Sequence, residues 1–299
     1  MTISQMQSFI EETVADSLLS REEEFERRME AVDRMDFLVI DRLDELLLQE
    51  DQQDLLLLKH RAESIKQQLE SIDAKMFRRL QARIRAGEAR GERFRELIRE
   101  YTGFNAAGSQ EAAMEYDHVD VFINGLFSFQ TMPEQTKELE PDMVYYQKTP
   151  ARIVFELVEK AGFTKEDIFY DIGAGLGQVA MLVHLLSGVP TRGIEFEPAF
   201  CGYANNCAAQ LHLANTVFIN ADARTACYSE GTVFFMFTPF KGQILQQVLN
   251  ALEKESLQRK IRIITYGPCT AHVASQNWLL PLSPGNGNAY SIAVFSSIS

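Results

Sequence analysis

An acidic residue followed by three glycines on alternate positions is the part of this sequence best suited to chemistry. The apolar run 168–170 has the composition of a buried strand, Asp171 ends it, and a helix-like run follows the glycines. The glycines are Gly173, Gly175 and Gly177. A strand, a glycine turn and a helix start bring backbone N–H groups close to a ligand, because no Cβ atom intervenes. The dinucleotide fingerprint requires its third glycine where Gln178 stands, so that pattern is not met.

The next two predicted strands also end in acidic residues. Residues 191–196 have strand composition and contain Glu195, and residues 216–222 end in Asp222. A carboxylate at the end of the second strand of such a unit can accept both ribose hydroxyls of a nucleoside. Asp222 is placed to accept from the amino group of an adenine. These acids therefore predict a nucleoside site at one edge of a sheet.

Each acid also has an alternative. Asp171 can simply cap the helix that follows it. Glu197 lies on the same face of its strand as Glu195, although Glu195 is nearer the apolar part. Asn220 is an alternative to Asp222 as the residue that contacts the adenine, and Asp222 can instead serve in a turn.

A second candidate region follows the apolar strand 231–237. It consists of Thr238, Pro239 and Phe240. Open α/β sheets bind ligands outside the carboxyl ends of their strands, so we expect this segment to face a substrate, and the alternative is a strand terminator. Upstream, Tyr146 and Thr149 precede the predicted helix 151–161, and we expect them, with Tyr145, to belong to a lid. Thr149 is also a candidate N-cap, and the tyrosines can equally be packing residues.

The elements that position these residues alternate between strand and helix. A fifth strand is predicted at 261–266, and a closing antiparallel pair at 278–280 and 290–295 is joined across the turn 285–288. The order predicts an α/β fold, a doubly wound parallel sheet with one reversed strand.

With these elements in place, residues 145–299 resemble the class I S-adenosylmethionine (SAM)-dependent methyltransferases, which have a Rossmann-like seven-stranded sheet. The run from Asp171 to Val179, D-I-G-A-G-L-G-Q-V, is especially similar to that of the non-SET histone lysine methyltransferases. A carboxylate suits SAM because SAM carries a sulfonium cation. The resemblance implies SAM as cofactor, Glu195 at the ribose and Asp222 at the adenine. It also implies a cofactor-binding set with these residues: Asp171, Gly173, Gly175, Gly177, Gln178 and Thr149.

The resemblance also implies which residues face the methyl acceptor. Thr238, Pro239, Phe240 and Tyr146 take this place, although related enzymes have Asn or Asp where this chain has Thr238. No strong general base is visible, which favours nitrogen as the acceptor, and the resemblance favours protein lysine. The alternatives are a small-molecule or RNA methyltransferase and a non-catalytic SAM-binding scaffold.

Residues 1–101 have a different composition. Apolar residues recur every three or four positions on two stretches, which predicts a helical hairpin or coiled-coil module with its bend near 50–54. Asp36 interrupts the first stripe, so a hairpin is favoured. A two-helix hairpin lacks a closed core, and we expect its stripes to meet the catalytic domain, a partner or, most simply, a second copy in a homodimer. Residues 102–144 are predicted to be a connector whose apolar part, 120–129, docks on the catalytic domain.

Composition limits the remaining possibilities. The 299 residues suit two domains, and a formal net charge of −13 makes nucleic acid an unlikely partner even though 75–99 is basic. The five histidines and four cysteines have no metal or redox spacing, so we expect no metal site and reduced thiols. No signal peptide or membrane-spanning run is evident, which predicts a soluble cytoplasmic protein.

Overall fold

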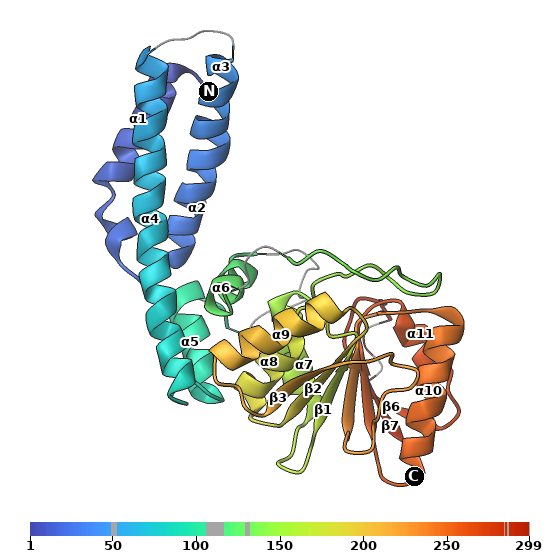
Figure 1. Ribbon diagram of the computed structural model, residues 1–299. Helices are drawn as coiled ribbons and strands as arrows, with labels where there is room; N and C mark the ends of the chain where they lie inside the picture. The colour runs from blue at the N-terminus through green and yellow to red at the C-terminus, as the bar shows by residue number, and fades with distance from the viewer. Residues whose placement is uncertain (49–52, 106–116, 129–131, 284, 286, 299) are drawn as a thin grey trace. The chain divides into compact units, whose positions relative to one another are not determined.

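The computed structural model describes residues 1–48, 53–105, 117–128, 132–283, 285 and 287–298. These residues form two compact units (Figure 1). The first unit contains Met1–Ala82, Glu96–Phe104 and Asp117–Leu126. The second unit contains Arg83–Arg95 and Phe127–Ser299, together with the segment Asn105–Tyr116, whose residues 106–116 lie outside the described ranges.

The first unit is helical, as predicted, but it is more than a hairpin. Its elements are α1 (Ile3–Ala15), the 3₁₀ turn η1 (Ser17–Ser20), α2 (Phe25–Met35), the π-helical turn η2 (Asp36–Ile40), α3 (Asp41–Leu47), α4 (Gln53–Arg85), α5 (Glu92–Thr102) and α6 (His118–Leu126). The predicted bend at 50–54 falls mainly on residues 49–52, which lie outside the described residues. The ends of α4 and α5 that belong to the second unit are residues 83–85 and 92–95.

Helix α1 closes the core that two helices leave open. Met6 and Ile10 of α1 are completely buried in the same cluster as Val39 and Leu43. The interruption at Asp36 is real, because it begins the π-helical turn, and its carboxylate bonds the Lys66 ammonium at 2.6 Å. The expectation that this region is a hairpin without a closed core was therefore wrong. Self-association stays a prediction, without the open core that motivated it.

The first unit also buries a charge. The Arg28 side chain is completely buried, and its Nε lies 2.8 Å from the Asp73 carboxylate. Its other nitrogens donate to the carbonyl oxygens of Leu19, Arg21 and Glu22. A buried guanidinium is tolerated only when it is paired and its donors are satisfied, as they are here.

Helix α6 packs within the first unit. The Phe122 ring lies 5.2 Å from the Phe25 ring and 5.4 Å from the Phe77 ring, centroid to centroid. The structure groups this part of the predicted connector with the N-terminal helices and assigns the residues from Phe127 onward to the second unit. The Phe122 ring of α6 therefore buries its apolar surface against helices of its own unit.

The second unit is the predicted α/β sheet. Its seven strands are β1 (Phe169–Ile172), β2 (Thr191–Glu195), β3 (Thr216–Asn220), β4 (Val233–Met236), β5 (Arg262–Thr265), β6 (Leu279–Ser283) and β7 (Ala293–Ser297). They lie in the order β3-β2-β1-β4-β5-β7-β6, with β1 to β5 parallel and β7 antiparallel to both of its neighbours. The single reversed strand is confirmed. The predicted turn 285–288 includes residue 286, which lies outside the described residues.

Helices cover both faces of this sheet. Figure 1 shows helices on each side of the strands. They are α7 (Ala151–Ala161), α8 (Gln178–Ser187) and α9 (Pro198–Gln210) on one face, and α10 (Gly242–Ser256) and α11 (Cys269–Ala274) on the other. Strands β1 and β4 are buried along their whole length, which is why they read as continuous apolar runs. The helix α11 was not predicted.

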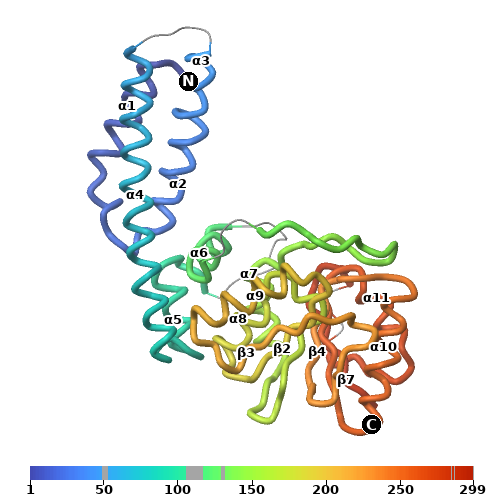
Figure 2. Tube along the Cα trace, in the orientation of Figure 1, coloured from blue at the N-terminus to red at the C-terminus, as the bar shows by residue number. Residues whose placement is uncertain are grey.

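An extended segment, residues 132–147, is here called the strap. The tube in Figure 2 follows it over the edge of the sheet where the parallel strands end. The Val144 N–H donates to the carbonyl oxygen of Pro239 at 3.0 Å, and the Lys241 N–H donates to that of Asp142 at 2.8 Å. The strap thus pairs with the chain that leaves β4.

Candidate active site

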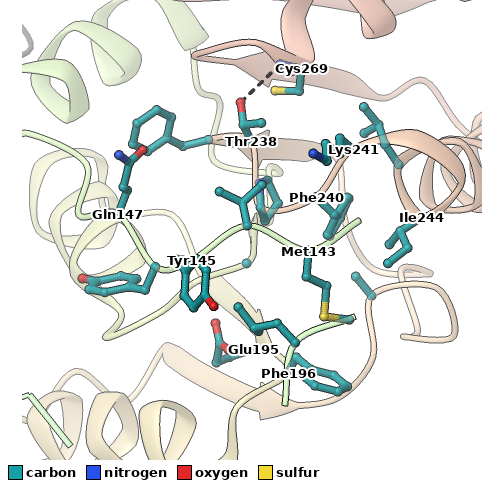
Figure 3. A pocket seen from close by; sticks show the side chains of 18 of the residues that line it. Met143, Tyr145, Gln147, Glu195, Phe196, Thr238, Phe240, Lys241, Ile244 and Cys269 are labelled. Carbon is teal, nitrogen blue, oxygen red and sulfur yellow. Dashed lines mark hydrogen bonds between the residues drawn. The ribbon is translucent and has the colours of Figure 1, made fainter. Parts of the chain in front are cut away.

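A cavity of about 470 Å³ opens where β1 to β4 end. Figure 3 shows its two sides. We call one the acidic side, lined by Glu195, Phe196, Glu197, Phe200 and Asp222, and the other the α10 side, lined by Thr238, Phe240, Lys241, Ile244, Cys269 and His272. The strap borders both. Small-molecule sites have volumes in this range, and open α/β sheets place them at this edge.

The glycine turn is built for close approach. All three glycines have positive φ, of 84°, 53° and 85° in chain order. A Cβ on Gly173 would lie 2.3 Å from Pro239, and one on Gly175 would lie 2.2 Å from the Tyr146 ring. Gly177 is packed equally tightly against Phe218. Of the three, Gly173 lines the cavity, while the other two shape the turn behind it.

Asp171 lies beneath this turn and does not itself line the cavity. It is buried, and its pKa is raised to about 8 by that burial and by the neighbouring Glu195 carboxylate. The Ala180 N–H, in the first turn of α8, acts in the opposite direction and lowers that pKa, whereas Gly177 takes the N-cap position of α8 without a side-chain bond. The Oδ2 atom of Asp171 has no hydrogen-bond partner among the described residues. A buried carboxylate oxygen without a partner is costly unless a ligand supplies one.

Glu195 lines the acidic side and is tied to the turn. One carboxylate oxygen accepts from the Gly175 N–H at 2.7 Å and the other from the Glu197 N–H at 2.8 Å. Burial raises the pKa of Glu195. Glu197 has a structural role instead, because its carboxylate caps α9 and accepts hydrogen bonds from the strap. Its carboxylate accepts from the Ala199 N–H, from the N–H and hydroxyl of Thr136 and from the Lys137 N–H.

Asp222 also borders the cavity, in an ion-pair network. Arg224 bonds both Asp222 oxygens and pairs with Glu140 of the strap. Hydrogen bonding to Arg224 lowers the pKa of Asp222, so this carboxylate is ionised at neutral pH. The competing residue, Asn220, donates its side-chain amide to the carbonyl oxygens of Glu195 and Phe196, which is a structural role.

The segment after β4 lines the other side of the cavity. Thr238 has an unusual positive φ of 38°, and its hydroxyl accepts from the Cys269 N–H at 3.2 Å. Pro239 packs on Gly173, and Phe240 is buried. Tyr146 lines the cavity from the strap, with its ring 5.6 Å from the Phe200 ring. These four predicted residues therefore lie together.

Besides Asp171, Gly175 and Gly177, two more predicted cofactor residues do not line the cavity. Gln178 is buried and donates its side-chain amide to the Thr149 carbonyl oxygen at 2.8 Å. Thr149 is buried too, and it does not cap α7, because Pro150 takes the N-cap position without a side-chain bond. The hydrogen bond between Gln178 and Thr149 joins the chain before α7 to the start of α8. Neither side chain lines the cavity, so any effect of these residues on a ligand is indirect.

Several lining residues were not predicted. Phe196 directly follows Glu195, and Lys241 directly follows the Thr238–Phe240 segment, so adjacency was a usable signal for both. Nothing in the sequence marks His272, since α11 was not recognised. Among the described residues, no group of three or more His, Cys, Asp or Glu side chains is arranged to hold a metal ion.

Comparison with known proteins finds a family model that matches the region around this site. Residues 137–272 match the sequence model of a family described as "Histone methylation protein DOT1". Among curated proteins, none matches the chain. The matched range begins in the strap and ends in α11, so it contains all the residues that line the cavity except Gln135 and Tyr290.

Several solved structures with a similar fold are described as methyltransferases. An RNA methyltransferase from Salinibacter ruber in complex with S-adenosyl-L-homocysteine is 21% identical, with a TM-score of 0.40, covering 50% of this chain and 92% of that one. A SAM-dependent methyltransferase from Aquifex aeolicus is 14% identical, with a TM-score of 0.41, covering 49% and 89%. Precorrin-6y C5,15-methyltransferase from Geobacter metallireducens is 13% identical, with a TM-score of 0.38, covering 52% and 92%.

The strand order, the glycine turn and the family match identify this chain as a class I SAM-dependent methyltransferase. Within that class its catalytic region is similar to the DOT1 histone methylation family, which confirms the resemblance seen in the run from Asp171 to Val179.

The cavity fits SAM, the cofactor of this class. Glu195 and Asp222 offer carboxylates to hydroxyl and amino groups, Phe196 and Phe200 offer flat apolar surface, and the unpartnered Oδ2 of Asp171 favours a nearby positive charge.

Proposed function

We propose that this methyltransferase modifies nitrogen, specifically the side-chain amine of lysine in a protein. The observation that carries the proposal is the match of residues 137–272 to a family described by histone methylation. That range holds most of the residues that line the cavity, on both of its sides, so the likeness extends beyond a generic cofactor motif.

Charge supports a basic protein as the acceptor. The chain has a formal net charge of −13 and a sequence pI of about 4.9. A protein of this charge attracts lysine-rich polypeptides and repels the phosphates of RNA. The same argument disfavours RNA, the main macromolecular alternative.

The cavity supports an acceptor that reacts as a neutral amine. Its α10 side is mainly apolar, with Phe240, Ile244 and Leu245 in the wall and Lys241 as a positive charge. Apolar surroundings and a like charge both favour the neutral form of an incoming amine. A neutral amine carries the lone pair that the reaction needs.

Each side of the cavity then has a task. SAM supplies a methyl group activated by a positively charged sulfur. Glu195 and Asp222 hold its nucleoside on the acidic side, and the buried carboxylate of Asp171 compensates positive charge beneath the turn. Tyr146 and the strap exclude water, and Thr238, Pro239 and Phe240 orient the acceptor. Catalysis of this kind rests on positioning.

The test is transfer of labelled methyl from SAM to core histones, to total RNA and to a small-molecule extract, followed by mass spectrometry of the labelled products. We expect label in protein, as a mass increase on lysine. The matched control is Gly175→Val, whose side chain has no room against Tyr146. Label confined to RNA, or to molecules below peptide size, refutes the protein-lysine proposal.

Two further assignments belong with this proposal. None of the described helices is long and apolar enough to cross a membrane. We place the enzyme in the cytoplasm because its cysteines lack disulfide spacing, and this stays a prediction. A homodimer through the N-terminal helices also stays a prediction, to be tested by sedimentation equilibrium.

A further inference from the structure

The two sides of the cavity carry opposite kinds of ionisable group. Among the described lining residues, the carboxylates are Glu195, Glu197 and Asp222, all on the acidic side. The α10 side has Lys241 and His272 instead. Phe240 and Ile244 lie with them in an otherwise largely apolar wall. An imidazole in such a place is a candidate to accept a proton.

Hydrogen bonds fix the helix that carries His272 to the segment after β4. The first residue of α11, Cys269, donates its N–H to the Thr238 hydroxyl at 3.2 Å, and its thiol lies 3.7 Å from the Met236 carbonyl oxygen. His272 follows three residues later, so it is on the same face of the helix as Cys269, and both line the cavity. Figure 3 shows Cys269 beside Thr238 on this wall.

The neighbours of His272 select one tautomer. Its Nε2 lies 2.8 Å from the side-chain oxygen of Gln246 on α10. That amide is itself oriented, since its nitrogen donates to the Asn250 side-chain oxygen at 2.8 Å. An amide oxygen only accepts, so Nε2 carries the proton and Nδ1 carries the lone pair. A fixed tautomer of this type is what a general base requires.

We propose that His272 is the proton acceptor for the substrate amine, at Nδ1. The N–H bond of the incoming ammonium breaks, its electron pair stays on nitrogen, and the proton moves to the imidazole. That pair then forms the new N–CH₃ bond while the pair of the old S–CH₃ bond stays on sulfur. The imidazolium returns its proton to solvent. The proposal rests on the amine acceptor proposed above.

The groups near His272 are compatible with this role. Lys241, at the start of α10, Tyr290 and the Cys269 thiol are the other ionisable groups lining this part of the cavity, besides the tyrosines of the strap. Strand β6, which packs on α11, has no titratable residue, and Arg262 of β5 is paired with Asp167. The Lys241 charge disfavours a protonated amine beside it, so it assists the transfer.

The experiment compares wild type, His272→Asn and Gln246→Glu with the control His212→Asn. His212 is exposed and has a φ of 54°, which Asn tolerates. SAM affinity and circular dichroism establish that each variant is folded. We measure kcat against pH with a protein substrate, and the ¹⁵N chemical shifts of the His272 ring.

We expect protonated Nε2 in the wild-type spectrum and an ascending limb in the pH profile of kcat, as for a reaction that needs an unprotonated base. His272→Asn should lower kcat at neutral pH by about 10²-fold, and its rate should keep rising at higher pH. Gln246→Glu should move the limb to higher pH, because a carboxylate stabilises imidazolium.

A kcat profile of His272→Asn that superimposes on wild type, or a ring protonated at Nδ1, overturns the proposal. These results differ from a failure of the proposed function, in which wild type itself transfers no methyl group to protein.

Discussion

Binding of SAM should release a proton, and Asp171 should be its main source. Burial and the Glu195 carboxylate raise the pKa of Asp171 to about 8, so the group is mainly neutral at pH 7 when no cation is near. The positive charge of SAM favours the ionised form. Binding and deprotonation are therefore coupled.

The magnitude follows from that pKa. An acid with a pKa of about 8 is roughly nine tenths protonated at pH 7. If SAM holds Asp171 ionised, about 0.9 proton leaves for each SAM bound, and the association constant rises up to about tenfold per pH unit below pH 8. Above pH 8 the affinity should level off.

The stability of the protein without SAM should move in the opposite direction. The pKa of Asp171 is raised above that of an ordinary aspartic acid side chain. The stabilisation provided by its neutral form is therefore complete at low pH and is lost as the pH rises towards about 8. The isosteric Asp171→Asn variant has no such loss. Its melting temperature should fall less than that of wild type between about pH 5 and pH 8.

The assay is isothermal titration calorimetry of SAM in buffers of different ionisation enthalpy, at several pH values. Asp171→Asn should release almost no proton and should bind with little dependence on pH. Glu195→Gln is the control for the second buried carboxyl, whose pKa is also raised. Proton release that persists undiminished in Asp171→Asn refutes the assignment, and so does wild-type binding that is independent of buffer and pH.

Three other substitutions test the structure. Gly175→Ala should weaken SAM binding at least tenfold in calorimetry, because its Cβ would lie 2.2 Å from the Tyr146 ring; unchanged affinity would show that this contact is dispensable. Glu197→Gln should speed proteolysis after Lys137, because it weakens the bonds that hold the strap, and equal cleavage of wild type would contradict this. Arg28→Leu should destabilise the first unit by about 3–5 kcal/mol in urea followed by circular dichroism, since it leaves the partly buried Asp73 carboxylate unpaired; a change below about 1 kcal/mol would count against it.

Periodic local patterns made most of the fold predictable. Alternating strands and helices from 151 to 266 appeared in the sequence because buried parallel strands are continuous apolar runs between amphipathic helices. The apolar stripes of the N-terminal helices were equally clear in the sequence, but the sequence did not show that α1 packs on them. A stripe shows that a helix has an apolar face, and only packing shows which helix covers it.

The sequence by itself determined the class of this protein. The acid and the glycines from Asp171 to Gly177 lie close together in the chain, so the chemistry of that turn is set by local backbone geometry. Only the tertiary structure decided which carboxylates face the cavity and which hold the strap, since Glu195 and Glu197 differ in their partners and not in type. Only the tertiary structure shows that His272 lines the same wall of the cavity as Thr238. The hydrogen bond between Cys269 and Thr238 joins segments far apart in the sequence, and no periodic pattern predicts such a bond.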